Sequence, residues 1–237
     1  TPSQSPAQLG DALLNDGNGN QWALVINDKL YVESLGAKNN PFDSTAIIQV
    51  AINHMSSRFN GGVVAATKSY LVSASAEPDV FVTSDGTPFP ASNGCILLRP
   101  KVTLEGLNRV SSTINSPDVT KHAILLVDGL DTAVQDLSLT GGDSLTGGGA
   151  GVFNVNSTTD QDVVRVSLRR LSISTFGGYG IGLSDGYLLN ALVEDCETSF
   201  TGSDGLDVKS RSSDASEEDT GNTITNFTAR AFGRLCC

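Results

Sequence analysis

Pairs of apolar residues two positions apart recur along the second half of the chain. The pairs are Leu125/Val127, Phe153/Val155, Ile181/Leu183 and Leu206/Val208, and the steps between them are 28, 28 and 25 residues. Residues two apart point to the same side of an extended strand. A near-constant step is typical of one structural unit that is repeated, with loops of variable length between the copies. The pattern predicts a solenoid of stacked strands in which these pairs face inward.

A second set of apolar positions repeats through other residues, with steps of 34, 25 and 31. The aligned positions are Leu137, Leu171, Cys196 and Phe227. Three positions before them lie Val134, Leu168, Val193 and Ile224, and two positions after them lie Leu139, Ile173, Thr198 and Ala229. Two interleaved sets predict at least two strands per coil, separated by glycine-rich turns. Because no coil contains a long segment of helical period, we expect an all-β, right-handed parallel β-helix with coils over about 63–235. The alternative is a β-sandwich with accidental spacing.

The first part of the chain follows a different pattern. Residues 1–28 are polar and predict a lead-in or attachment segment, so the β-helix domain is expected over 29–237. From Ser44 the apolar positions take a helical period, which predicts one amphipathic helix over about 44–59, capped by Asp43 or Ser44 and ended by Gly61 and Gly62. The end of a β-helix exposes unpaired strands and apolar side chains. We therefore expect this helix to cap the solenoid.

Several residues around this helix resemble the N-terminal signature of the pectate-lyase-like superfamily, as it appears in bacteriophage tailspikes. The matching residues are Asp43, Thr45, Ile48, Ala51, Ile52, Gly61, Gly62, Val63, Tyr70, Val72, Val102, Leu104 and Gly106. The resemblance covers about residues 30–235 and implies a short right-handed β-helix that assembles as a homotrimer. Residues 39–42 depart from the Gly-Asp-Gly loop usual in that family. The same scaffold carries lyases, hydrolases, epimerases and non-catalytic virion proteins, so the resemblance does not by itself assign an activity.

Charge and composition exclude several kinds of partner. The formal net charge is −11, which repels phosphate groups and argues against binding to nucleic acid or to an anionic membrane surface. There is no run of eighteen apolar residues that could span a bilayer. No spacing of cysteine and histidine suggests a zinc site, and the sequence predicts no metal and no other cofactor.

The four cysteines fall into two kinds. Cys196 lies on a core position of the second repeat, and Cys95 begins an apolar run, so both are expected to be inert. Cys236 and Cys237 are adjacent, and neighbouring residues of an extended chain point in opposite directions, so a bond between them would be strained. We expect them to form inter-chain disulfides, either within the homotrimer or to other virion proteins; the alternative is a frayed end with two thiols.

Candidate chemistry gathers around Asp207, which the repeat places one coil beyond Gly182. Strands of successive coils lie roughly 4.8 Å apart, so a carboxylate beside a missing side chain would border a shallow bay. Asp204 and Asp207 are the candidate catalytic acid and base, and the candidate carbohydrate-binding residues are Tyr179, Asp185, Lys209 and Arg211. The alternative is structural, because Asp185 and Asp204 are also ordinary turn formers and Lys209 can simply pair with Asp207.

The mannuronan epimerases and related lyases on this scaffold carry a Tyr-Gly-x-Asp-Pro-His motif. This chain has Tyr-Gly-Ile-Gly-Leu-Ser at 179–184, which keeps the tyrosine and lacks the acid and the histidine. Only about five coils fit after the helix at the observed step, whereas a depolymerase usually needs a longer groove. We therefore expect a structural spike component on the surface of a phage virion that contacts host glycan. The alternatives are a polysaccharide depolymerase, acting as a glycoside hydrolase or lyase, and a secreted bacterial cell-surface β-helix.

Overall fold

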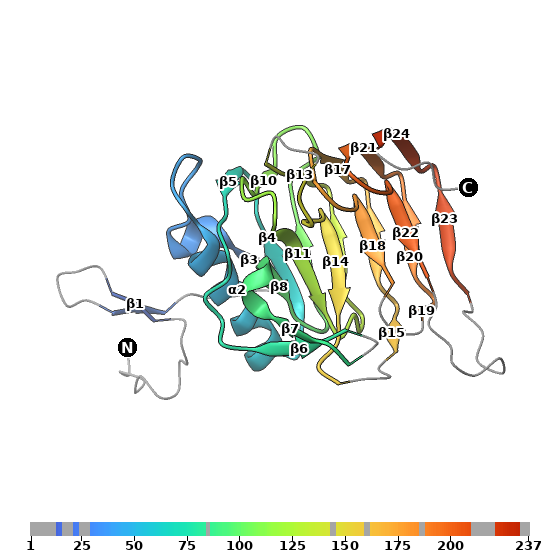
Figure 1. The fold of residues 1–237 in the computed structure, drawn as a ribbon. Helices are drawn as coiled ribbons and strands as arrows, with labels where there is room; N and C mark the ends of the chain where they lie inside the picture. Colours follow the sequence, from blue (N-terminus) through green and yellow to red (C-terminus); the bar gives the residue numbers. More distant parts are fainter. Residues whose placement is uncertain are drawn as a thin grey trace.

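The computed structural model describes residues 13–15, 21–23, 29–83, 86–142, 146–158, 162–184, 188–209 and 221–232. Three parallel sheets wind around one apolar interior and form a solenoid (Figure 1). Sheet I contains β8 (Gly94–Leu98), β11 (His122–Val127), β14 (Val152–Val155), β18 (Ile181–Leu183) and β22 (Leu206–Val208). In each complete coil the chain passes from sheet I to sheet II and then to sheet III.

The other two sheets are built from equally short strands. Sheet II contains β3 (Lys29–Tyr31), β4 (Gly62–Ala65), β9 (Val102–Glu105), β12 (Ala133–Gln135), β16 (Ser167–Arg169), β20 (Leu192–Glu194) and β23 (Thr223–Thr225). Sheet III contains β5 (Ser69–Leu71), β10 (Thr113–Asn115), β13 (Ser138–Thr140), β17 (Ser172–Ser174), β21 (Glu197–Thr201) and β24 (Thr228–Phe232). The parallel strands β15 (Val163–Val164) and β19 (Leu188–Leu189) form a small sheet, and β1 (Leu13–Asn15) pairs antiparallel with β2 (Gln21–Ala23) inside the predicted lead-in.

The second set of repeated residues is confirmed, and it resolves into two sheets. Val134 pairs with Leu168, Leu168 with Val193, and Val193 with Ile224 in sheet II. Leu139, Ile173, Thr198 and Ala229 pair in the same way in sheet III. Leu137, Leu171 and Cys196 are buried at the corner between the two sheets. The coil therefore has three main strands, consistent with the prediction of at least two.

The first set of repeated residues is real, but its prediction of a single inward-facing column is wrong. Val152 pairs with Ile181, and Phe153 pairs with Gly182, so the alignment of Phe153 with Ile181 is off by one residue. Ile181 and Leu183 pack in the interior. Leu125 and Val155 instead lie in a second apolar cluster on the outer face of sheet I. Both faces of β11 are buried, so its apolar run has no alternation from which the inward side could be read.

The outer cluster is covered by a hairpin that the sequence did not predict. Strand β6 (Val80–Val82) pairs antiparallel with β7 (Pro88–Pro90), and the short 3-10 helix η3 (Ala91–Asn93) follows. Phe81, Phe89 and Ala91 pack against the outward side chains of sheet I. The hairpin thereby buries apolar surface that would otherwise face solvent at the first coils of this sheet.

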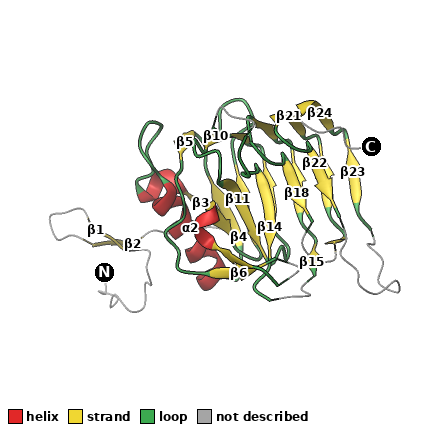
Figure 2. Cartoon of the chain, viewed as in Figure 1, coloured by secondary structure: helices red, strands yellow, loops and turns green. Residues whose placement is uncertain are grey.

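The capping helix is confirmed. Helix α2 (Thr45–Phe59) lies at one end of the solenoid, together with the 3-10 helix η2 (Val32–Leu35), and buries Ile48, Ala51, Ile52 and Met55 against the interior (Figure 2). Asp43 Oδ1 accepts hydrogen bonds from the N–H and the hydroxyl of Thr45, at 2.8 and 2.6 Å, and satisfies a free donor of the first turn. Asn60, with φ of 54°, ends the helix. Within the described part of the chain, no helix is long and apolar enough to cross a bilayer.

Candidate functional site

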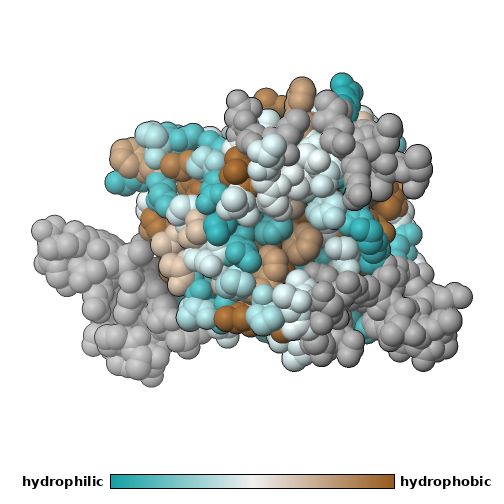
Figure 3. Space-filling model, in the orientation of Figure 1, coloured by the Kyte–Doolittle hydropathy of each residue, from teal (hydrophilic) through white to brown (hydrophobic). Residues whose placement is uncertain are grey.

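The outer face of sheet I changes character along the solenoid. Over its first coils the hairpin covers apolar side chains, and beyond Phe153 the outward positions become Gly182 and Asp207. Tyr179 and Asp204 lie just before these strands, in the turns that lead into β18 and β22. The space-filling view shows apolar and hydrophilic residues side by side on the surface of the molecule (Figure 3). The predicted site residues that the structure describes therefore share one face, next to the edge of the hairpin.

Asp207 lies one coil beyond Gly182, as the repeat predicted. Its carboxylate is only 4% exposed and accepts a hydrogen bond from Lys209 Nζ at 2.8 Å. This hydrogen bond raises the pKa of Lys209, and the charges of Asp207 and Asp204 add to the effect while burial opposes it. The ammonium also lies 6.0 Å from the centre of the Tyr179 ring. The structure thus brings Tyr179, Asp204, Asp207 and Lys209 together.

In this cluster, Asp204 has a carboxylate oxygen that accepts no hydrogen bond from the described residues. It lies one coil beyond Tyr179, since its carbonyl accepts a hydrogen bond from Gly180 N at 3.0 Å. The residue is 5% exposed, and its buried Oδ1 has no hydrogen-bond partner among the described residues. A buried carboxylate oxygen without a donor costs free energy, so a ligand hydroxyl that supplied one would be favoured.

The bay expected at Gly182 is filled by an aromatic ring. A Cβ placed on Gly182 would lie 2.8 Å from Cδ2 of Phe153 and 3.4 Å from Cδ2 of Tyr179. The missing side chain therefore gives room to the Phe153 ring rather than leaving an open hollow. The result is an aromatic surface directly beside the two carboxylates, a combination suited to the apolar face and the hydroxyl groups of a sugar ring.

Phe153 belongs to a row of stacked rings that reaches under the hairpin. Its centroid lies 4.7 Å from that of His122 and 6.0 Å from that of Phe89, with interplanar angles of 26° and 20°. Burial lowers the pKa of His122 from 6.5 to about 4, and its Nδ1 accepts a hydrogen bond from Ala150 N at 3.1 Å. The histidine is therefore neutral at pH 7 and acts as one more flat ring in the row.

Phe153 and His122 are the residues of this site that the sequence interpretation missed. The signal that could have identified Phe153 is the glycine opposite it, because an aromatic ring often covers a glycine on the neighbouring strand. Asp185 and Arg211, predicted to contact carbohydrate, lie outside the described residues, as do Cys236 and Cys237. Cys95 and Cys196 are buried free thiols, as expected, and burial raises the pKa of each to about 11. Among the residues that the structure describes, no cluster of acidic, histidine or cysteine side chains is suited to hold a metal ion.

Comparison with solved structures shows the fold. Over 86% of this chain and 57% of that chain, the structure is similar to the A-module of the mannuronan C-5 epimerase AlgE4 of Azotobacter vinelandii, with 20% sequence identity and a TM-score of 0.53. The A-module of AlgE6 of the same bacterium matches over 85% of this chain and 55% of that chain, with 19% identity and a TM-score of 0.50. The chain therefore spans little more than half the length of these modules.

A third similar structure is the tailspike protein gp49 of the Acinetobacter baumannii bacteriophage Fri1, a capsular polysaccharide depolymerase. It matches over 94% of this chain and 45% of that chain, with 14% identity and a TM-score of 0.43. No protein-family model and no curated protein matches the chain. Together with the strand pairing, the epimerase modules establish the right-handed parallel β-helix that the tailspike-like signature predicted.

Proposed function

We propose that this protein is a spike component on the surface of a phage virion, and that it contacts host glycan through the outer face of sheet I. The observation that carries the glycan contact is the buried, unsatisfied Oδ1 of Asp204 beside Tyr179. The tailspike-like signature between Asp43 and Gly106 supports the assignment to a phage particle. The established β-helix fold is compatible with this role.

The contact uses the aromatic rings and the carboxylates for different parts of the sugar. The rings of Tyr179 and Phe153 offer a flat apolar surface beside Gly182. Asp204 accepts hydrogen bonds from sugar hydroxyls, and Asp207, held by Lys209, adds a second fixed acceptor. A hydrogen bond to a charged group contributes about 1.5–3 kcal/mol, so a few such contacts give measurable binding.

Titration of the protein with purified capsule or exopolysaccharide of the host bacterium tests this proposal, with isothermal calorimetry as the readout. Tyr179→Ala and Asp204→Asn are each expected to weaken binding by about tenfold or more. Tyr31→Ala and Asp131→Asn are the matched controls, because Tyr31 is exposed on sheet II and Asp131 lies exposed in the turn that follows β11, at the opposite end of the sheet I strands from Tyr179. Site variants that bind as tightly as the unmodified protein would contradict the proposal, and so would controls that weaken binding equally.

The pair of carboxylates also supports a second candidate, a polysaccharide depolymerase. Glycoside hydrolysis needs two carboxyl groups on either side of the scissile bond, and Asp204 and Asp207 are close enough to act on the same Lys209. Reducing-end and unsaturated-product assays on the same polysaccharide separate the two functions. If the protein releases products and the Asp204→Asn/Asp207→Asn double variant does not, the protein is a depolymerase that uses these carboxylates. If it binds the polysaccharide without releasing products, it is a structural spike component.

Assembly as a homotrimer is part of the proposal and comes from the tailspike resemblance. Cys236 and Cys237 are proposed to link the chains to one another or to other virion proteins. Native mass spectrometry without reductant is expected to give a trimer. A stable monomer under these conditions would exclude the homotrimer while leaving the glycan contact open to its own test.

A further inference from the structure

The corner between sheets II and III carries a column of left-handed residues, one from each coil. Asp136, Arg170, Asp195 and Asn226 have φ values of 58°, 50°, 53° and 50°. Each of the first three donates its N–H to the next coil, with Asp136 N bonded to Arg169 O and Arg170 N bonded to Glu194 O, at 3.1 and 2.9 Å. The four side chains therefore follow one another along the solenoid.

The side chains of this column are held in two pairs. Arg170 donates from Nε and Nη2 to the two carboxylate oxygens of Asp136, at 2.6 and 2.7 Å, and Asn226 Nδ2 donates to Asp195 Oδ1 at 2.9 Å. These bonds leave Nη1 of Arg170 and Oδ2 of Asp195 without a partner among the described residues. The column thus presents fixed donors and acceptors that the protein does not use.

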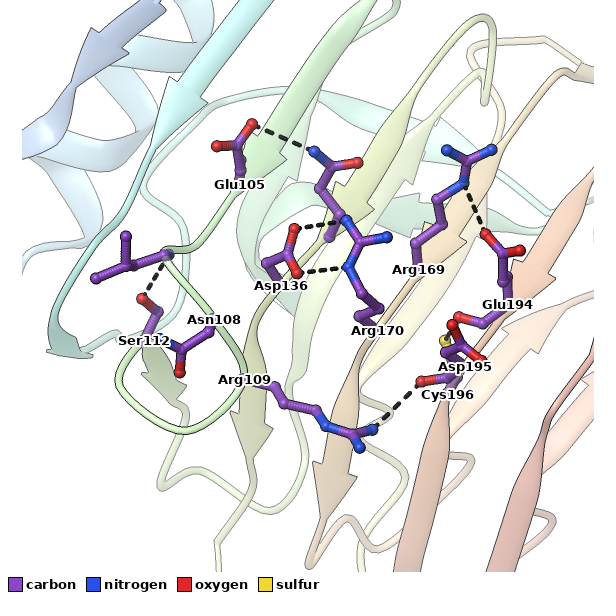
Figure 4. Close-up of polar contacts among 12 residues, drawn as sticks. Glu105, Asn108, Arg109, Ser112, Asp136, Arg169, Arg170, Glu194, Asp195 and Cys196 are labelled. Carbon is purple, nitrogen blue, oxygen red and sulfur yellow. Dashed lines mark hydrogen bonds and ion pairs between the residues drawn. The ribbon is translucent and has the colours of Figure 1, made fainter.

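A loop over residues 107–111 overhangs this column. The Asn108 carboxamide oxygen accepts hydrogen bonds from the N–H groups of Val110 and Ser111, both at 2.9 Å, which holds the loop in a tight turn. From this loop Arg109 reaches across to the carbonyl of Asp195, with Nη1 at 3.4 Å from the oxygen (Figure 4). The single long hydrogen bond leaves most of the Arg109 donors available.

The loop and the column border an open groove of about 540 Å³. Its charged lining residues are Arg109, Asp136, Arg170, Asp195 and Glu197. This volume falls in the range of small-molecule sites and is large enough for one or two sugar rings. The groove lies on the corner between sheets II and III, whereas the proposed glycan contact lies on sheet I.

The chemistry of the lining selects the ligand. The lining contains two arginines and three carboxylates, and the charge of Arg170 is already neutralised by Asp136. Neither an anion nor a cation is strongly favoured in such a groove, but a hydroxyl group can accept from a guanidinium and donate to a carboxylate at the same time. We propose that this groove binds an uncharged sugar unit, whose hydroxyls accept from Arg109 and donate to Asp195 and Glu197. The inference does not rest on the proposed function of sheet I.

Titration with small glycosides tests this second site. The protein carries Tyr179→Ala and Asp204→Asn, so that binding at sheet I does not contribute, and the ligands are the methyl glycosides of glucose, galactose, mannose and N-acetylglucosamine. At least one neutral glycoside is expected to give saturable ligand-observed NMR signals. Arg109→Ala and Asp195→Asn are each expected to weaken its binding by about tenfold or more. Asparagine also tolerates the left-handed conformation of position 195.

The corner between sheets I and II supplies matched control residues. Asp131 and Arg165 are also left-handed and ion-paired, with φ of 51° and 58°, but they do not line the groove. Asp131→Asn and Arg165→Ala are expected to change glycoside affinity less than twofold, and circular dichroism confirms that each variant is folded. The proposal is overturned if no neutral glycoside of the panel binds, if Arg109→Ala and Asp195→Asn bind it unchanged, or if methyl glucuronide binds more tightly than methyl glucoside.

Discussion

The ring of Phe153 lies over Gly182, its partner one coil further on, so closely that a Cβ at Gly182 would stand 2.8 Å from ring atom Cδ2. This contact joins the apolar row beneath the hairpin to the polar end of sheet I. It also explains the one-residue error in the first repeat, because the chain pairs the aromatic ring with a glycine rather than with Ile181.

Substituting Gly182 by alanine is expected to lower the free energy of unfolding by about 1–3 kcal/mol, because the added methyl group displaces the Phe153 ring. Urea unfolding measures the change. Gly148→Ala is the control, since a Cβ there meets no atom within 4 Å, and it is expected to be neutral or slightly stabilising. Equal stability of the two variants would argue against the contact.

His122 is expected to make stability depend on pH. Burial lowers its pKa in the folded state from 6.5 to about 4, with a smaller contribution from Lys121, so between these values the unfolded chain binds a proton that the folded chain does not. The free energy of unfolding therefore falls as pH drops from about 6.5 to 4, by about 3 kcal/mol in total. Denaturant unfolding at several pH values is expected to show this slope in the unmodified protein and in His54→Gln. A slope that persists unchanged in His122→Gln would contradict the assignment.

Tyr70 is expected to stabilise the first coil through its hydroxyl. The residue is fully buried, and its hydroxyl donates to Glu33 Oε1, which also accepts from Thr67 N at 3.1 Å. Tyr70→Phe removes one donor from a partly buried carboxylate and is expected to cost about 1–3 kcal/mol of unfolding free energy. Tyr31→Phe is the control, because it removes a hydroxyl from a side chain that is 46% exposed. Its midpoint of thermal unfolding is expected to equal that of the unmodified protein.

The cysteines are expected to differ in reactivity. Cys95 and Cys196 are buried, and burial raises the pKa of each thiol to about 11, so iodoacetamide should not label them in the native protein at pH 7.5. Cys236 and Cys237 are expected to form inter-chain bonds. Non-reducing electrophoresis should show a covalent multimer. This multimer should be absent when reductant is added, and absent in the Cys236→Ser/Cys237→Ser double variant. A monomer in both lanes would exclude the bonds.

Much of the site followed from repetition alone. Each coil repeats the same contacts, so the spacing of Gly182 and Asp207 was enough to place one beside the other. The spacing of Val134, Leu168 and Val193 likewise predicted their pairing in sheet II. Such positions are predictable because a parallel strand pairs residue by residue with its neighbour, and a shift by one would turn apolar side chains outward.

The sequence by itself determined the solenoid, the capping helix and the neighbourhood of Asp207, since these depend on local period and on the step between coils. Only the tertiary structure decided which side of β11 and β14 faces the interior, because the hairpin buries their outer side as well and removes the alternation. It alone placed Phe153 against Gly182 and brought Arg109 across the groove to Asp195. The first contact depends on the register of β14 against β18, which the two buried faces of sheet I hide from the sequence pattern. The second depends on the path of the loop over residues 107–111, which no periodic pattern encodes.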